Sequence, residues 1–317
     1  MAEDSIAVVD LDRCQPDRCN YECVNFCPPN RTGKECIVTR NEHFEDADKD
    51  EYAGAPDQVW ISEEICLGET CGICVEKCPF DAIQIINLPT ELETEPAHRY
   101  GDNAFALYGL PAPSEGRVTG LLGPNGIGKS TAVKILAGEF QPNLGRFEDP
   151  PDWDDVLDQY RGTGLQDYLE ALRDDAVSVA RKPQYVDHIP DQFEGKTRDL
   201  LERTDERDAL AEVAERLSIT PVLDSPIETL SGGELQRVAI AAALVRDADF
   251  YFLDEVTPYL DISQRVAAAR LIRELAEEED RSMLVVEHDL AILDLLADNI
   301  NVAYGTPGAF GIITPPK

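Results

Sequence analysis

Residues 117–131, RVTGLLGPNGIGKST, decide the fold of this chain. The stretch begins with apolar residues typical of a buried strand, Val118, Leu121 and Leu122. It continues into a glycine-rich loop and ends where a helix is expected to begin, near Lys129. The loop fits the phosphate-binding pattern G-x-x-x-x-G-K-[ST] from Gly123 to Ser130. The stretch therefore predicts an α/β domain with a nucleotide site at the end of a strand.

The chemistry of the loop explains its residue types. Glycines let backbone N–H groups curl around phosphate oxygens, and the following helix directs its positive end at the anion. Lys129 would reach the β- and γ-phosphates, and the Ser130 hydroxyl would ligate Mg²⁺. A glycine turn without a ligand is the alternative, but strand, loop and helix follow in the order that phosphate binding requires. The residues expected to contact ATP in this loop are Gly123, Pro124, Asn125, Gly126, Ile127, Gly128, Lys129, Ser130 and Thr131.

The composition limits the partners without deciding them. The 317 residues carry 28 basic and 62 acidic side chains, a formal net charge of −34. Such a charge normally argues against nucleic acid, whose phosphates need Lys and Arg. The acidic residues are spread throughout, which fits a surface adapted to high salt and leaves RNA possible as a partner. No signal peptide is visible, and the longest apolar run, residues 238–245, is short for a membrane span, so we expect a cytoplasmic protein.

All nine cysteines lie between Cys14 and Cys78, which indicates a separate N-terminal domain. In a cytosolic protein they are expected to be metal ligands rather than disulfides. They form two runs that each end in Cys-Pro and each follow a strand-like stretch, residues 6–9 and 59–61. The first run is Cys14, Cys19, Cys23 and Cys27, and the second is Cys66, Cys71, Cys74 and Cys78.

The second run resembles the bacterial ferredoxin pattern, in which the cysteine before proline ligates the other 4Fe-4S cluster. The resemblance implies one cluster on Cys66, Cys71, Cys74 and Cys27, and a second on Cys14, Cys19, Cys23 and Cys78. The gap after Cys66 is longer than in ferredoxins, and the unassigned Cys36 could replace Cys27. Zinc in four-thiolate sites is the alternative metal. No partner redox centre is evident, so a structural or mechanical role is favoured over electron transfer.

Four further motifs follow the loop in a fixed order. They are Gln184 in KPQYVDHIP, the run LSGGELQ at 230–236, the apolar strand FYFLDE at 250–255, and His288 at the end of MLVVEH. In this order and spacing they resemble an ABC-type ATPase. The family usually reads Asp-Glu-Pro after this strand; Val256 replaces the proline here, while Asp254 and Glu255 remain.

The chemistry assigns a role to each motif. Asp254 would hold Mg²⁺, and the adjacent Glu255 would polarise the attacking water as general base. Gln184 would link that water and Mg²⁺ to the mobile part of the domain, and His288 would donate to the γ-phosphate. By resemblance, the helix opened by the signature residues Ser231, Gly232, Gly233, Glu234 and Gln236 serves ATP on a second domain, and Asp261 lies in the loop coupling the two sites.

Two aromatic side chains precede the phosphate loop. Tyr100 lies just before the stretch NAFALYGL at 103–110, and Phe105 lies within it. The alternation of apolar and polar residues in this stretch predicts an edge strand. Either ring could stack on adenine, and either could equally be a core residue.

The combined motifs resemble the RNase-L-inhibitor-like ATPases, ABC subfamily E. The stretches that carry the resemblance include CPFDAIQIINLP (78–89), HRYGDNAF (98–105), KPQYVDHIP (182–190) and LSGGELQRVAIAAAL (230–244). The resemblance implies a ferredoxin-like α+β domain at 1–88 and an ABC nucleotide-binding domain at 89–305, with a mixed sheet core and a helical arm. Within it, 150–171 resembles a helix–loop–helix insert that either faces the ribosome or is an ordinary helix pair. Residues 306–317 resemble a hinge.

For function, the resemblance implies an ATPase that splits ribosomes into subunits. Its cofactors would be ATP, Mg²⁺ and two 4Fe-4S clusters. Its partners would be the small ribosomal subunit with its rRNA, and termination, release or initiation factors. It would not bind a membrane. Only one phosphate loop and one LSGGELQ occur, so a second ABC domain would have to act in trans or be missing, and hydrolysis by this chain alone would be weak. The alternatives are an ABC subunit for transport or cluster assembly, and a ferredoxin-like electron carrier gated by nucleotide.

Overall fold

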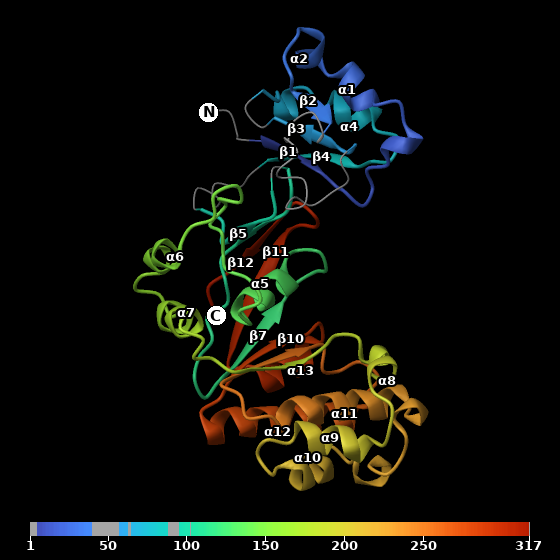
Figure 1. The fold of residues 1–317 in the computed structure, drawn as a ribbon, viewed down its shortest axis with the longest axis vertical. Coiled ribbons are helices and arrows are strands. Elements are labelled where there is room, and N and C mark those ends of the chain that lie inside the picture. The colour runs from blue at the N-terminus through green and yellow to red at the C-terminus, as the bar shows by residue number, and fades with distance from the viewer. Residues whose placement is uncertain (1–4, 40–56, 63–64, 88–94, 102, 317) are drawn as a thin grey trace.

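The computed structural model describes residues 5–39, 57–62, 65–87, 95–101 and 103–316. They form a small N-terminal head resting on a larger α/β unit (Figure 1). Within the described part, no helix is both long and apolar enough to cross a membrane.

The head is built from two antiparallel strand pairs and short helices. Strand β1 (Ser5–Val9) pairs with β4 (Ile83–Asn87), and β2 (Ile37–Thr39) pairs with β3 (Val59–Ile61). The longer helices are α1 (Glu22–Phe26), α2 (Pro28–Arg31) and α4 (Ile73–Lys77). The strands expected ahead of each cysteine run are thus confirmed, and so is the α+β class of the head.

An eight-stranded mixed sheet forms the centre of the larger unit. Its order is β5 (His98–Arg99), β6 (Ala106–Tyr108), β12 (Phe310–Ile313), β11 (Asn299–Thr306), β7 (Val118–Leu122), β10 (Ser282–Val286), β9 (Phe250–Asp254) and β8 (Val179–Lys182). The five strands from β11 to β8 are parallel. Their carboxyl ends therefore meet at one edge, where loops bind ligands in open α/β sheets.

Helices cover both faces of this sheet. The period-two alternation of β9 sends Phe250 and Phe252 to one core and Tyr251 and Leu253 to the other. The first core is closed by α5 (Lys129–Leu136), α6 (Trp153–Gln159) and α7 (Gln166–Arg173). The second is closed mainly by α9 (Thr197–Thr204), α10 (Leu210–Arg216), α11 (Gly232–Leu244) and α12 (Ile262–Glu279), with α8 (Ile189–Gln192) beside α11 and α13 (Leu290–Leu296) against β7 (Figure 1).

Two expectations about strands need correction. The stretch 103–110 is not an edge strand, because β5 occupies the edge and β6 lies inside it. Only Ala106–Tyr108 of that stretch forms a strand, and Asn103 lies at the tip of the β5–β6 hairpin, where it is fully buried. Residues 306–317, expected to be a hinge, contain β12, which pairs with β11 and β6 inside the sheet.

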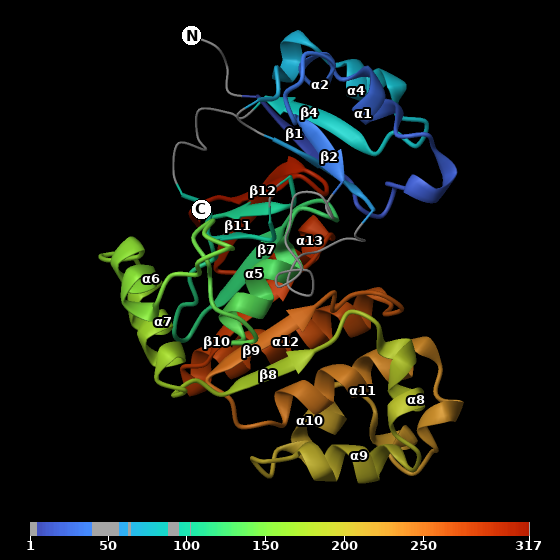
Figure 2. The same cartoon turned by 45° about the horizontal axis from the view of Figure 1, so that its top comes forward.

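The head meets the sheet through a small apolar cluster. Val8 and Ile86 of the head pack with Ala309 and Phe310 of the β11–β12 turn region. Figure 2 shows the head directly above β11 and β12. This contact brings the loop after β1 close to the phosphate loop.

Candidate functional site

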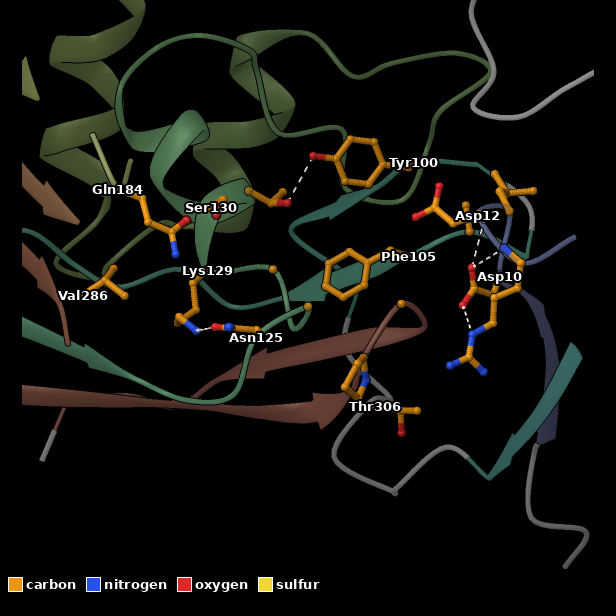
Figure 3. Close-up of a pocket in the computed structure, with 18 of the residues that line it drawn as sticks. Asp10, Asp12, Tyr100, Phe105, Asn125, Lys129, Ser130, Gln184, Val286 and Thr306 are labelled. Atoms are coloured by element: carbon orange, nitrogen blue, oxygen red, sulfur yellow. Dashed lines mark hydrogen bonds and ion pairs between the residues drawn. The ribbon is translucent and has the colours of Figure 1, made fainter. Parts of the chain in front are cut away.

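A cavity of about 910 Å³ lies where the head, the phosphate loop and the ends of the parallel strands meet (Figure 3). Its walls include Lys129 and Ser130, the carboxylates of Asp254 and Glu255, and Gln184. Phosphate-binding, carboxylate and amide groups from distant parts of the chain therefore face one space, as a nucleotide site requires.

The phosphate loop connects β7 to α5, as the sequence predicts. Gly128 has φ of +86°, and a Cβ there would lie 2.6 Å from the Phe105 ring. A Cβ on Gly123 would lie 2.2 Å from the carbonyl oxygen of Ala303. Only glycine fits both positions, so the backbone of the loop can follow the path that exposes its N–H groups to the cavity.

Lys129 lies on the inner side of the loop. It is buried, and its Nζ donates to the carbonyl oxygens of Gly123 at 2.8 Å and Pro124 at 2.7 Å. Burial lowers the pKa of Lys129, while the nearby carboxylates of Asp254 and Glu255 oppose that shift. The ammonium group is therefore held beside the acidic edge of the cavity.

The other loop residues divide between the cavity and the core. Asn125, Gly126, Ser130 and Thr131 line the cavity, and the Asn125 side chain accepts from Lys129 at 3.4 Å. Ile127 is fully buried in the core, so only its backbone can serve a ligand. Pro124 is exposed at the loop surface.

The acidic edge combines two carboxylates with different surroundings. Asp254 ends β9, and burial together with the neighbouring Glu255 raises its pKa to about 6. Glu255 follows with φ of +48°, a conformation that non-glycine residues adopt mainly at special sites. Gln184 donates to its Oε1 at 2.8 Å, and His288 Nε2 lies 3.5 Å from the same oxygen. The strand ends thus bring together Gln184, Glu255 and His288.

Two buried side chains, Lys182 and Gln236, support this acidic edge from within the domain. The sequence did not indicate Lys182, and it predicted a different role for Gln236. Lys182, fully buried at the end of β8, donates to the carbonyl oxygens of Asp254 at 2.6 Å and Glu255 at 2.8 Å. Burial lowers its pKa to about 8. No signal in the sequence marks Lys182, because a lysine at a strand end is usually exposed.

Gln236 belongs to the expected signature set but does not face outward. It is 1% exposed, and its Nε2 donates to the carbonyl oxygens of Glu255 at 2.7 Å and Val256 at 2.9 Å. Its side chain therefore supports the chain's own carboxylate loop and is not available to ATP on another domain. The reason is helical periodicity, which turns Gln236 inward when Ser231 faces solvent.

The remaining signature residues lie at the exposed start of α11. Ser231 is the N-cap and forms a capping box with Glu234, whose pKa these hydrogen bonds lower. Gly232 and Gly233 open the helix beside Tyr259. Asp261 caps α12 by accepting from the backbone N–H of Gln264 at 2.9 Å.

Both aromatic candidates line the cavity. The Tyr100 hydroxyl forms a hydrogen bond with Thr131 Oγ1 at 3.1 Å, and the Phe105 ring lies over Gly128. Figure 3 shows the two rings on the side of Lys129 that faces the head. They share the cavity wall with Asp10, Asp12 and Arg13 of the head, which the sequence did not indicate.

The cysteines lie around two small cavities in the head. One cavity is lined by Cys14, Cys19, Cys23 and Cys78, and the other by Cys27, Cys36, Cys66, Cys71 and Cys74. Each cavity thus draws cysteines from both runs, in the exchanged arrangement that the ferredoxin pattern implies. Among the described residues, no three Cys, His, Asp or Glu side chains converge on the position of a single ion. The two cavities are small, with about 20 and 10 Å³ of free space, so the thiols enclose them closely.

Comparison with protein families finds two matches. A family described as "ABC transporter" matches residues 113–258, and one described as "Possible Fer4-like domain in RNase L inhibitor, RLI" matches residues 4–35. The first spans the phosphate loop and the carboxylates, and the second spans the first cysteine run.

Curated relatives and a solved structure match over nearly the whole chain. The Arabidopsis thaliana "ABC transporter E family member 1" is 48% identical over 98% of this chain and 49% of its own length. The Saccharomyces cerevisiae "Translation initiation factor RLI1" is 46% identical over 98% of this chain and 49% of its own length. A chain in "Model of ribosome-bound archaeal Pelota and ABCE1" superposes with a TM-score of 0.88 at 50% identity, covering 99% of this chain and 50% of that one. The chain spans about half the length of the curated relatives it matches.

Proposed function

Because the chain belongs to the RNase-L-inhibitor-like ABC ATPases, ABC subfamily E, we propose that it binds and hydrolyses Mg·ATP as part of a cytoplasmic factor that splits ribosomes into subunits. The observation that carries the proposal is the single cavity in which the phosphate loop, the carboxylate edge and the head meet. In this arrangement a nucleotide would touch both the hydrolytic groups and the cysteine-rich domain.

The ATP site would work by positioning and charge. Lys129 and the loop N–H groups would hold the β- and γ-phosphates, while Ser130, Gln184 and Asp254 would hold Mg²⁺. Glu255 would accept the proton of the attacking water, and its bond from Gln184 keeps the carboxylate turned toward the cavity. His288 would donate to the γ-phosphate. Tyr100 and Phe105 would pack on the adenine.

Hydrolysis would need a second ABC domain. Ser231, Gly232 and Gly233 lie at the exposed start of α11 and do not line the cavity of this chain, so they would serve ATP on a partner domain. Asp261 would couple the two sites. Alone, the chain would bind ATP and hydrolyse it weakly.

The head would hold two 4Fe-4S clusters. Cys14, Cys19, Cys23 and Cys78 would ligate one, and Cys66, Cys71 and Cys74 the other together with Cys27, or with Cys36 in its place. Such clusters supply a rigid scaffold that the short strands of the head alone would not provide.

The division of the chain would follow its architecture. We assign 1–88 to the iron–sulfur domain and 89–305 to the ABC domain, with the helix–loop–helix pair α6 and α7 corresponding to the 150–171 insert. Residues 306–317 would complete the sheet through β12 before leading toward a second ABC domain. The partners would be the small ribosomal subunit with its rRNA and the termination, release or initiation factors that work there.

Sedimentation with ribosomal particles tests this proposal. We expect the chain to co-sediment with small ribosomal subunits when a non-hydrolysable ATP analogue and Mg²⁺ are present, and Lys129→Ala to abolish the effect. Lys134→Ala is the matched control, because Lys134 lies on the same helix but is exposed and outside the cavity. If the chain is missing from the small-subunit fraction both with and without the ATP analogue, the proposal is contradicted.

A further inference from the structure

The buried tip of the β5–β6 hairpin links the two domains. Asn103 at this tip is fully buried and has φ of +55°. Asparagine tolerates this left-handed conformation better than most residues. A polar side chain buried in such a conformation indicates a position fixed by its contacts.

Those contacts are with the iron–sulfur head. The Asn103 Oδ1 accepts from the backbone N–H of Ile61 at 2.7 Å, and its Nδ2 donates to the carbonyl oxygen of Ala7 at 3.0 Å. The N–H of Val9 donates to the Asn103 carbonyl oxygen at 3.3 Å. Asn103, a residue of the ATPase domain, thus bridges β1 and β3, which belong to the two separate strand pairs of the head.

The sides of the same hairpin are fixed to the phosphate loop. The N–H of Tyr100 donates to the carbonyl oxygen of Phe105 at 3.1 Å, which closes the hairpin. Phe105 lies against Gly128, and the Tyr100 hydroxyl bonds to Thr131. Only one residue separates the tip from Phe105, so a displacement of the head that moves the tip also moves a wall of the cavity.

The head forms another part of the cavity wall beside this hairpin. Asp10 accepts from the backbone N–H groups of Asp12 at 3.1 Å and Arg13 at 3.2 Å, and it pairs with the Arg13 side chain at 3.4 Å. Figure 3 shows Asp10 and Asp12 beyond Tyr100 and Phe105 as seen from Lys129. A ligand that fills the cavity therefore contacts surfaces of both domains.

We propose that the β5–β6 hairpin couples the nucleotide at the phosphate loop to the docking of the iron–sulfur head, with Asn103 as the positioning residue. The inference rests on the proposed function and assigns the coupling to one contact. Moving the head away would break the hydrogen bonds of the Asn103 amide and exchange them for bonds to water, so they contribute a modest net stabilisation to the docked state. By thermodynamic reciprocity, nucleotide binding and head docking then influence each other equally.

Amide hydrogen exchange on the full, anaerobically prepared chain tests the coupling, with Mg·ADP as the probe. In the wild type, Mg·ADP should change the exchange of Ser5–Val9 and Val59–Ile61 by about fivefold or more. Asn103→Gly keeps the left-handed backbone but removes the amide, and it should abolish that change while Mg·ADP still binds. Asn103→Asp keeps an acceptor for Ile61 and loses the donor to Ala7, so it should give an intermediate response.

Asn301→Ala is the matched control. Asn301 is also buried and its Nδ2 donates to the backbone carbonyl oxygen of Thr314 at 2.7 Å, within the ATPase domain and outside the β5–β6 hairpin. It should leave the nucleotide response of the head intact. The inference is overturned if Asn103→Gly responds like the wild type, or if the wild type binds Mg·ADP without any change in the head. Failure of the wild type to bind Mg·ADP would overturn the proposed ATP site itself.

Discussion

The amide of Gln184 donates to the carboxylate of Glu255 across 2.8 Å, although 71 positions separate the two residues in the chain. Gln184 follows β8 and Glu255 follows β9, and these strands are parallel neighbours in the sheet. The bond therefore depends on strand order, and it orients the carboxylate proposed to activate water.

Glu255→Gln should lower ATP hydrolysis by about 10²- to 10⁴-fold and leave ATP binding intact, because the amide cannot accept the proton from water. Steady-state phosphate release and equilibrium nucleotide binding measure the two effects. Glu115→Gln, an exposed site outside the cavity, is the control. In an assembly with a second ABC domain, the variant should retain bound ATP. Hydrolysis that is unchanged in Glu255→Gln would remove its assigned role.

Gln236→Leu should lower the free energy of unfolding by about 1–3 kcal/mol, because the carbonyl oxygens of Glu255 and Val256 lose a buried donor. Urea unfolding monitored by circular dichroism measures this. Gln159→Leu, at an exposed position of α6, provides a comparison of the same chemical change. If Gln236→Leu left stability unchanged and impaired only the paired assembly, an outward role for Gln236 would be supported instead.

His98 should make the chain less stable in mild acid. Burial lowers the pKa of His98 from 6.5 to about 4. Between these pH values the unfolded state binds a proton at His98 and the folded state does not. The stability from neutral His98 is fully present above pH 6.5 and is lost as the pH falls toward 4. The loss should be about 2 kcal/mol once solvent screening is allowed for.

The measurement is urea unfolding at several pH values between 7 and 4, comparing the wild type with His98→Phe. The phenyl ring keeps the packing against Tyr100 and Phe140 without a titrating group. The variant should show a shallower decline. Equal declines in both proteins would exclude His98 as the cause.

Replacement of single cysteines should distinguish the two cavities. Cys78→Ser should remove about four iron atoms per chain by breaking the site shared with Cys14, Cys19 and Cys23. Cys27→Ser should remove the other four, while Cys36→Ser should keep all eight. Iron and sulfide analysis with low-temperature electron paramagnetic resonance measures these outcomes.

Cys36→Ser decides between two candidates for the same ligand position, because Cys36 and Cys27 line the same cavity. If Cys36→Ser lost four irons and Cys27→Ser kept eight, Cys36 would be the ligand. Zinc in place of iron in the anaerobically purified chain would contradict the cluster assignment altogether.

Much of the architecture follows from local sequence. The apolar stretch before Gly123, the helix after Gly128 and the strand ending in Asp254 all form where their periodicity predicts, because strand and helix formation here depends on neighbouring residues. The exchange of Cys27 and Cys78 between the two runs also appears around the two cavities, since the chain pairs β1 with β4 and brings the runs together.

The sequence alone determined the phosphate loop, the order of the motifs and the two cysteine runs, because each is a pattern of residue type and spacing over a short distance. Only the tertiary structure decided that Lys182 and Gln236 support the carboxylate edge from within, that residues 310–313 complete the sheet, and that Asn103 enters the head. These contacts join residues far apart in the chain, and their polar side chains become buried only because distant backbone groups supply their hydrogen bonds.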